Sequence, residues 1–117
     1  AEFSRNDGYQ YSQAETLTES GYLSGYSTRY NGAVENGRGT WVAEADSGTT
    51  RRVGFFSGAE FMRNDGYQFS RINSHWESGY LFGYSNRYDG GNFLGYAEWV
   101  AEAGSGTTVR TPSDSDN

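Results

Sequence analysis

The sequence of 117 residues lacks cysteine and lysine altogether and contains a single proline and a single histidine. Without cysteine it has no disulfide framework and no thiolate metal site. Every basic residue is therefore arginine, and the formal net charge is −6. An acidic surface argues against nucleic acid and anionic membranes as partners. No apolar run approaches the roughly 18 residues of a membrane span, so no membrane insertion is predicted.

Aliphatic side chains are also scarce. Hydrophobic residues make up 34% of the chain, below the roughly 45–50% of ordinary domains, but ten Tyr, seven Phe and three Trp are present. The core must therefore be built mainly from aromatic rings, with many tyrosine hydroxyls left at its rim. The 17 glycines accompany regular aromatics, which indicates turns rather than disorder.

The chain repeats itself. Residues 19–30 recur almost unchanged as residues 77–88, and about 31 of the first 50 positions match at this spacing. Such self-similarity predicts two tandem repeats, at residues 1–58 and 59–110. The second repeat has a shortened fourth strand, and residues 111–117 form a polar, acidic tail.

Short segments rich in aromatic and β-branched residues alternate with glycine turns, which is typical of an all-β protein. The strands expected in the first repeat lie at residues 14–18, 22–30, 40–45 and 49–56. Gly25 and Gly83 fall inside strands and predict a close approach of another backbone or ring. Residues 31–39 and 89–97 diverge most and are predicted to be loops, where repeat proteins often bind ligands.

No metal or cofactor site is predicted. The Asn-Asp-Gly sequences at residues 6–8 and 64–66 favour turns, because asparagine and aspartate tolerate the left-handed region and glycine adopts it freely. A calcium loop is the alternative for these segments. Calcium needs several oxygen ligands at fixed spacing, and each segment has one carboxylate.

No catalytic residues are predicted either. His75 has no counterpart in the first repeat, where Leu17 stands, and no Gly-x-Ser-x-Gly element is present. A Ser-His-Asp arrangement therefore has little support. Paired carboxylates could hydrolyse glycosides, but the glutamates recur in both repeats, which is more typical of structural ion pairs. These repeated glutamates are Glu2, Glu19, Glu44, Glu60, Glu77 and Glu102. We therefore expect a protein that is not an enzyme.

The repeated motif resembles a known family. Each repeat carries Glu-Ser-Gly-Tyr-Leu-x-Gly-Tyr-Ser, then a variable segment, Trp-Val and a Ser-Gly-Thr-Thr turn, at residues 19–27, 41–42 and 47–50 and again 58 positions later. The pattern resembles the bacterial extracellular HAF-type repeats, in a long variant of about 58 residues. The His-Ala-Phe that names the family is replaced by Trp-Val-Ala at residues 41–43 and 99–101.

This resemblance implies two four-stranded antiparallel units similar to β-propeller blades, located outside the cell or at its surface. Propellers need about four to eight blades, so two units would leave faces and edges open. The chain is then either part of a longer array or a subunit that associates with copies of itself. A compact two-repeat β-sandwich or barrel is the alternative architecture.

Two functions follow as expectations. The first is assembly or surface structure, as a homo-oligomer or filament held by aromatic and β-edge contacts between chains. The second is lectin-like, multivalent carbohydrate binding, since sugar rings stack on aromatics and their hydroxyls pair with polar side chains. The competing interpretation is that the same rings simply form the core. The candidate sugar-binding residues are Tyr30, Asn31, Trp41, Tyr88, Asp89 and Trp99.

Overall fold

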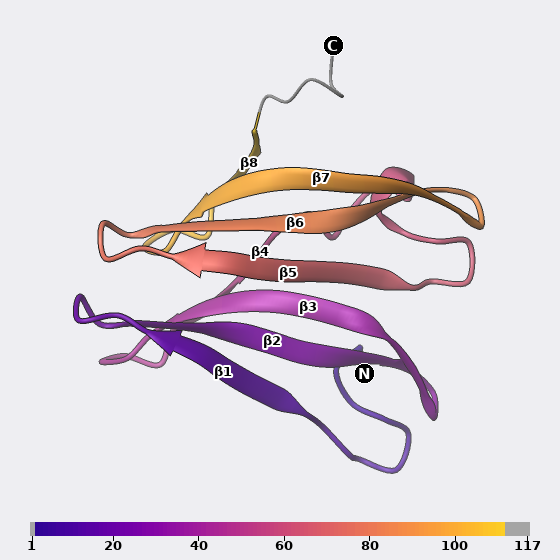
Figure 1. Ribbon diagram of the computed structural model, residues 1–117. Coiled ribbons are helices and arrows are strands. Elements are labelled where there is room, and N and C mark those ends of the chain that lie inside the picture. The colour runs from indigo at the N-terminus through magenta and orange to yellow at the C-terminus, as the bar shows by residue number, and fades with distance from the viewer. Residues whose placement is uncertain (1, 112–117) are drawn as a thin grey trace.

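The computed structural model describes residues 2–111 (Figure 1). Of the predicted tail, residues 111–117, only Thr111 lies within this range, and the other tail residues lie outside it. The protein is all-β, as predicted, and 57% of the described residues lie in strands. A short 3-10 turn, η1, covers Ala59–Phe61. The strands are β1 (Ser12–Leu17), β2 (Tyr22–Asn31), β3 (Val34–Glu44), β4 (Thr50–Val53), β5 (Gln68–His75), β6 (Tyr80–Asp89), β7 (Asn92–Glu102) and β8 (Thr108–Arg110).

The eight strands form one open mixed sheet (Figure 1). In the first half of the chain, β1, β2, β3 and β4 pair as an antiparallel meander, and β5 to β8 do the same in the second half. A short parallel ladder between β3 and β5 joins the halves, through Gly37 with Gln68 and Arg38 with Phe69. β3 therefore pairs with β5 near its start and with β4 near its end.

Both halves have the same strand register. Ser12 lies opposite Ser27, and 58 residues later Ser70 lies opposite Ser85. The in-strand glycines account for how closely these strands approach. A Cβ on Gly25 would overlap the Gln13 carbonyl oxygen, and a Cβ on Gly83 would overlap the Arg71 carbonyl oxygen and the Trp99 ring. The predicted close approach at both glycines is therefore confirmed.

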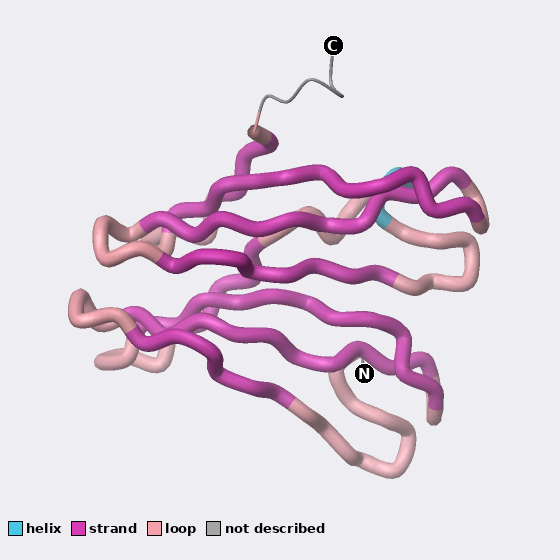
Figure 2. Tube along the Cα trace, viewed as in Figure 1, coloured by secondary structure: helices cyan, strands magenta, loops and turns pink. Residues whose placement is uncertain are grey.

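The predicted loops at residues 31–39 and 89–97 are wrong. β3 already begins at Val34 and β7 at Asn92, so only a two-residue turn separates each pair of strands (Figure 2). Gly32 opens the first turn with φ 65° and Gly90 opens the second with φ 61°. Glycine at this position suits the tight turns that match strand twist. Glycines in both segments, together with the polar residues of the first, obscured their strand character.

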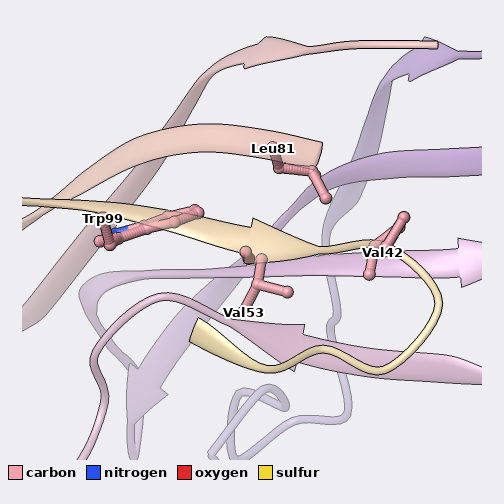
Figure 3. Close-up of a cluster of buried hydrophobic side chains, with 6 residues drawn as sticks. Val42, Val53, Leu81 and Trp99 are labelled. Carbon is pink, nitrogen blue, oxygen red and sulfur yellow. The ribbon is translucent and has the colours of Figure 1, made fainter. Parts of the chain in front are cut away.

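The hydrophobic core lies where the two halves face each other (Figure 3). Val42 from β3 and Val53 from β4 pack with Leu81 from β6 and Trp99 from β7. Each of these side chains is at most 1% exposed. The core thus stabilises the contact between the halves as much as either half alone. Within residues 2–111, no helix has the length and apolar character needed to cross a membrane.

Candidate functional site

The six candidate sugar-binding residues occupy three different environments. Tyr30, Tyr88 and Trp99 are buried, with exposed fractions of 8%, 5% and 0%. Asn31 and Asp89 are exposed at the ends of β2 and β6, beside the hairpin turns. Trp41 is partly exposed in the middle of β3. The structure brings Tyr30 and Asn31 together along one groove but does not gather the six residues into one site.

Trp99 is enclosed by the contact between the halves. Its ring lies over Gly83, where an added Cβ would come within 2.6 Å of a ring carbon, and a Cβ on Gly54 of the first half would come within 3.2 Å. The indole N–H donates a hydrogen bond of 3.1 Å to the Ser85 hydroxyl. The same hydroxyl accepts the backbone N–H of Phe55 at 3.0 Å. The burial of Trp99 therefore depends directly on the first half.

Trp41 occupies the corresponding position of the first half but is not enclosed. It lines an open groove of about 380 Å³ together with Leu23, Ala43, Ser12, Ser27 and Thr50. We call the surface formed by Leu23, Trp41, Ala43 and Ala45 the Trp41 face. Each of these four residues is at least partly exposed. Their counterparts, which have identical side chains and are at most 1% exposed, are Leu81, Trp99, Ala101 and Ala103.

The second half has an uncovered face of its own. Phe82 lies opposite Val100, which lies opposite Val109, so the three share one side of β6, β7 and β8. Phe82 and Val109 are 36% and 53% exposed, and Tyr80 beside them is 45% exposed. Trp76 packs edge-on against Phe82 with ring centroids 5.7 Å apart. We call the surface formed by these five residues the Phe82 face.

The corresponding side of the first half is covered. Val42, which matches Val100, is 0% exposed within the core. Ser24, which matches Phe82, shares a hydrogen bond of 2.8 Å with Nδ1 of His75. The molecule therefore contains one formed contact between two faces, and it exposes one further copy of each face.

A third surface is a cleft lined by aromatic rings. Its volume is about 510 Å³. We define the aromatic cleft by the residues that line it: Arg5, Tyr9, Tyr11, Tyr26, Thr28, Tyr30, Ala33, Glu35 and Arg38. The Arg38 guanidinium lies over the Tyr26 ring, 3.9 Å from its centroid. Of these residues only Tyr30 was among the sequence candidates. The alternation that places Tyr26 and Tyr30 on one side of β2 is the signal that could have found the cleft.

The second half fills the equivalent space with its own rings. Tyr96 stands in place of Arg38 and packs edge-on against Tyr84, with centroids 4.5 Å apart. Phe93 stands in place of Glu35 and contacts Tyr96 at 5.4 Å. The charged groups that line the cleft of the first half are thus absent from these two positions. The two halves of the chain therefore differ at the position of the aromatic cleft.

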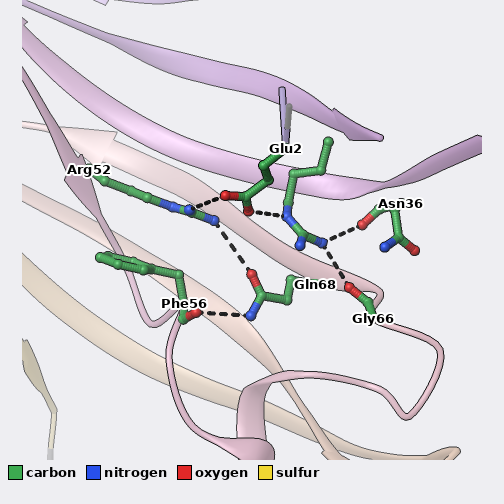
Figure 4. Close-up of polar contacts among 7 residues, drawn as sticks. Glu2, Asn36, Arg52, Phe56, Gly66 and Gln68 are labelled. Carbon is green, nitrogen blue, oxygen red and sulfur yellow. Dashed lines mark hydrogen bonds and ion pairs between the residues drawn. The ribbon is translucent and has the colours of Figure 1, made fainter. Parts of the chain in front are cut away.

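Beside this cleft, charged residues hold the N-terminal segment onto the sheet (Figure 4). Arg29 donates to Glu2 at 2.6 Å and to the backbone carbonyls of Asn36 and Gly66 at 2.6 and 3.0 Å. Arg52 donates to the other Glu2 oxygen at 3.1 Å. Burial acts to raise the pKa of Glu2, but the bonds from the two arginines outweigh it and lower the pKa overall. These charges are paired, as expected for structural residues.

The Asn-Asp-Gly segments use their carboxylates internally. Asp7 receives two bonds from the Arg5 guanidinium, at 2.9 and 2.8 Å, and a third from the Tyr9 backbone N–H at 3.0 Å. The Arg5 bond is the main reason that the pKa of Asp7 falls to about 2. Asp65 and Arg63 repeat this arrangement. No cluster of three or more metal-binding side chains occurs among residues 2–111.

His75 lies in the contact between the halves. Its Nδ1 is bonded to Ser24, and its Nε2 is buried without a hydrogen-bond partner among the described residues. Burial lowers the pKa of His75, and the nearby Glu77 carboxylate opposes this shift more weakly. A serine–histidine pair acts as a nucleophile and base when a third group orients the imidazole. The arrangement around Nε2 does not supply that group.

The chain matches no family model, no curated protein and no solved structure.

Proposed function

We propose that this protein is a non-enzymatic assembly protein that associates with copies of itself through exposed sheet faces. The observation that carries the proposal is the contrast between two identical sets of side chains. Trp99 and its neighbours are fully buried by the other half of the chain, whereas Trp41 and its neighbours remain uncovered. A sequence that repeats the same apolar face is suited to bury it in the same way.

The energetics favour covering this face. A tryptophan buries about 150–250 Å² of surface when enclosed, which at about 25 cal/mol per Å² stabilises by roughly 4–6 kcal/mol. Trp41 is already partly covered, so its remaining contribution is about 2–3 kcal/mol on the same scale. The Phe82 face adds further apolar area. β1 also lies at one end of the strand order, where an edge strand can pair with another chain.

We further propose that the two halves are tandem four-stranded units similar to propeller blades. Support comes from the 58-residue spacing of the repeated sequence and from the equal registers of the two meanders. The resemblance to HAF-type repeats favours a location outside the cell or at its surface. On this proposal, assembly continues between chains the stacking of units that occurs within one chain.

Light scattering after size exclusion, over a dilution series, tests the proposal. We expect a mass above the 13.0 kDa of one chain that falls on dilution. Trp41→Ala should shift the equilibrium toward single chains. Leu94→Ala is the matched control, because Leu94 is 49% exposed on β7 outside both faces. A folded single chain at every concentration of the series would refute the proposal.

Carbohydrate binding in the aromatic cleft is the second candidate function. Tyrosine faces alongside Arg38 and Glu35 offer both stacking surface and hydrogen-bonding groups for a sugar. A glycan array is the direct test, with Tyr11→Ala and Arg38→Ala as cleft variants and Leu94→Ala as control. Flat binding across a broad array would exclude this candidate. Binding that survives both cleft variants would place the sugar elsewhere.

A further inference from the structure

We propose that copies of this chain join head to tail, with the Trp41 face of one copy packed on the Phe82 face of the next. The inference rests on the proposed self-association and specifies its geometry. Its template is the contact between the two halves within a single chain. There, the face of the second half that contains Trp99 packs on the face of the first half that contains Val42.

Within the chain, two polar contacts set the register of this template. The Ser24 hydroxyl bonds to His75, and the Glu77 carboxylate accepts the backbone N–H groups of Glu19 and Ser20 at 3.0 and 3.2 Å. Replacing each residue of this contact by its counterpart in the other half of the sequence gives the contacts expected between copies. Leu17 takes the place of His75, and Phe82 takes the place of Ser24.

The two replaced residues are complementary to each other. The polar Ser24–His75 pair inside the chain becomes an apolar Leu17–Phe82 pair between chains. Leu17 is 67% exposed and Phe82 is 36% exposed in the single chain, so both are available for this contact. The mixed combinations, leucine with serine or histidine with phenylalanine, would bury a polar group without a partner, which is unfavourable. The two pairs therefore distinguish the contact within a chain from the contact between chains.

Two polar positions support the same register. By the same repeat relation, the Glu19 carboxylate of one copy faces the backbone N–H groups at Glu77 and Ser78 of the next. Tyr22 places its hydroxyl next to Gly104 inside the chain, where an added Cβ would be 3.3 Å away. Tyr80 stands in place of Tyr22, and Asp46 in place of Gly104. A tyrosine hydroxyl can donate to an aspartate carboxylate, so the copies gain a bond that glycine does not supply internally.

Such a contact joins two different surfaces and is therefore heterologous. Repeating it yields a ring if the rotation closes and a filament if it does not. Glu98, which replaces Thr40, is the least complementary position because it carries a charge toward the partner's Trp41 face. We therefore expect Glu98→Thr, which restores the residue of the first half, to strengthen association.

Thiol cross-linking tests the geometry, because the natural chain has no cysteine. Leu17→Cys and Phe82→Cys are made separately in the full chain, mixed, and treated with a short bis-maleimide. We expect a cross-linked dimer in the mixture and little in either variant alone. Leu94→Cys mixed with Leu17→Cys is the negative control. A double Ser24→Cys/His75→Cys variant, which should link within one chain, is the positive control.

The outcomes separate the two proposals. If light scattering shows association but Leu17→Cys alone forms dimers, like faces meet and the head-to-tail arrangement is wrong while self-association stands. If association persists with no dimer in any mixture, the copies use other surfaces, which also overturns this inference. If the chain is a monomer at every concentration, both proposals fail.

An exchange of the internal pair provides a second readout. Leu17→His or Phe82→Ser alone should raise the dissociation constant by about 10-fold or more, because each leaves a polar group unpaired in the contact. The double variant carries the Ser24–His75 combination between chains and should recover most of that loss. Additive losses in the double variant would contradict the contact between these two positions.

Discussion

Replacing each of the two matched tryptophans by alanine should have very different consequences. Trp99 is 0% exposed, rests on Gly83 and donates to Ser85. Truncating a buried aromatic to alanine lowers the free energy of unfolding by about 3–5 kcal/mol. Trp41, in the same sequence context, is partly exposed. In the single chain its truncation should cost about 1–2 kcal/mol, typical of positions outside a packed core.

Urea unfolding followed by far-UV circular dichroism measures both values, at a dilution where light scattering finds single chains. With a slope of about 2 kcal/mol per molar, Trp99→Ala should lower the midpoint by roughly 2 M and Trp41→Ala by roughly 0.5–1 M. For association between chains, we expect Trp41→Ala to have the larger effect of the two variants. Trp41→Ala should raise the dissociation constant by about 30-fold or more, the effect of losing an interface hot spot of about 2 kcal/mol.

Two results would refute this reasoning. Equal and large losses of stability in single chains would mean that Trp41 is already enclosed within its own half. An unchanged dissociation constant for Trp41→Ala would mean that the Trp41 face takes no part in association. Leu94→Ala is the control for both measurements, and neither its stability nor its association should change by more than about 0.5 kcal/mol.

Three further changes test the internal structure. Gly83→Ala should lower the free energy of unfolding by about 1–3 kcal/mol or more, because its Cβ would overlap the buried Trp99 ring. Gly91→Ala, whose Cβ would have no neighbouring atom closer than 3.5 Å, should change it little, and urea midpoints of the two variants test the difference. The free energy of unfolding should fall as the pH drops through the ordinary histidine pKa of about 6.5, because burial lowers the pKa of His75 and the unfolded chain therefore takes up a proton that the folded chain does not. His75→Leu should flatten this part of the pH profile of the melting temperature. Arg29→Lys should lower the free energy of unfolding by about 1–3 kcal/mol, since lysine cannot reproduce the guanidinium bonds to a carboxylate and two carbonyls. Arg87→Lys, at the corresponding position of the second half, should lower it by under about 1 kcal/mol, because Arg87 bonds to the Glu60 carboxylate from a partly exposed position. Equal losses in urea unfolding would contradict this.

The sequence was sufficient for the fold class and for much of the strand pattern. β2, which covers Tyr22–Asn31, lies almost where residues 22–30 were expected, because alternating tyrosines and a flanking glycine turn are strong local signals. The in-strand glycines also predicted close contacts correctly. The start of β3 was missed because its residues are polar and glycine-rich. Its strand conformation depends on pairing with β2 and β5, which local propensity does not reveal.

The candidate surfaces were harder to predict, for a physical reason. Trp41 and Trp99 have the same neighbours in sequence, Trp-Val-Ala-Glu-Ala, yet one is partly exposed and the other is fully buried. The difference arises from which surface packs on each face, and that depends on the arrangement of the halves. The aromatic cleft likewise combines residues from the N-terminal segment and β3, including Arg38, that sequence spacing does not bring together.

The mass of the native particle, measured by light scattering over a dilution series, tests self-association most directly. We predict particles heavier than the 13.0 kDa chain, in a defined multiple for a ring or a broad distribution for a filament, that Trp41→Ala shifts toward single chains. A folded particle of one chain at every concentration would contradict it.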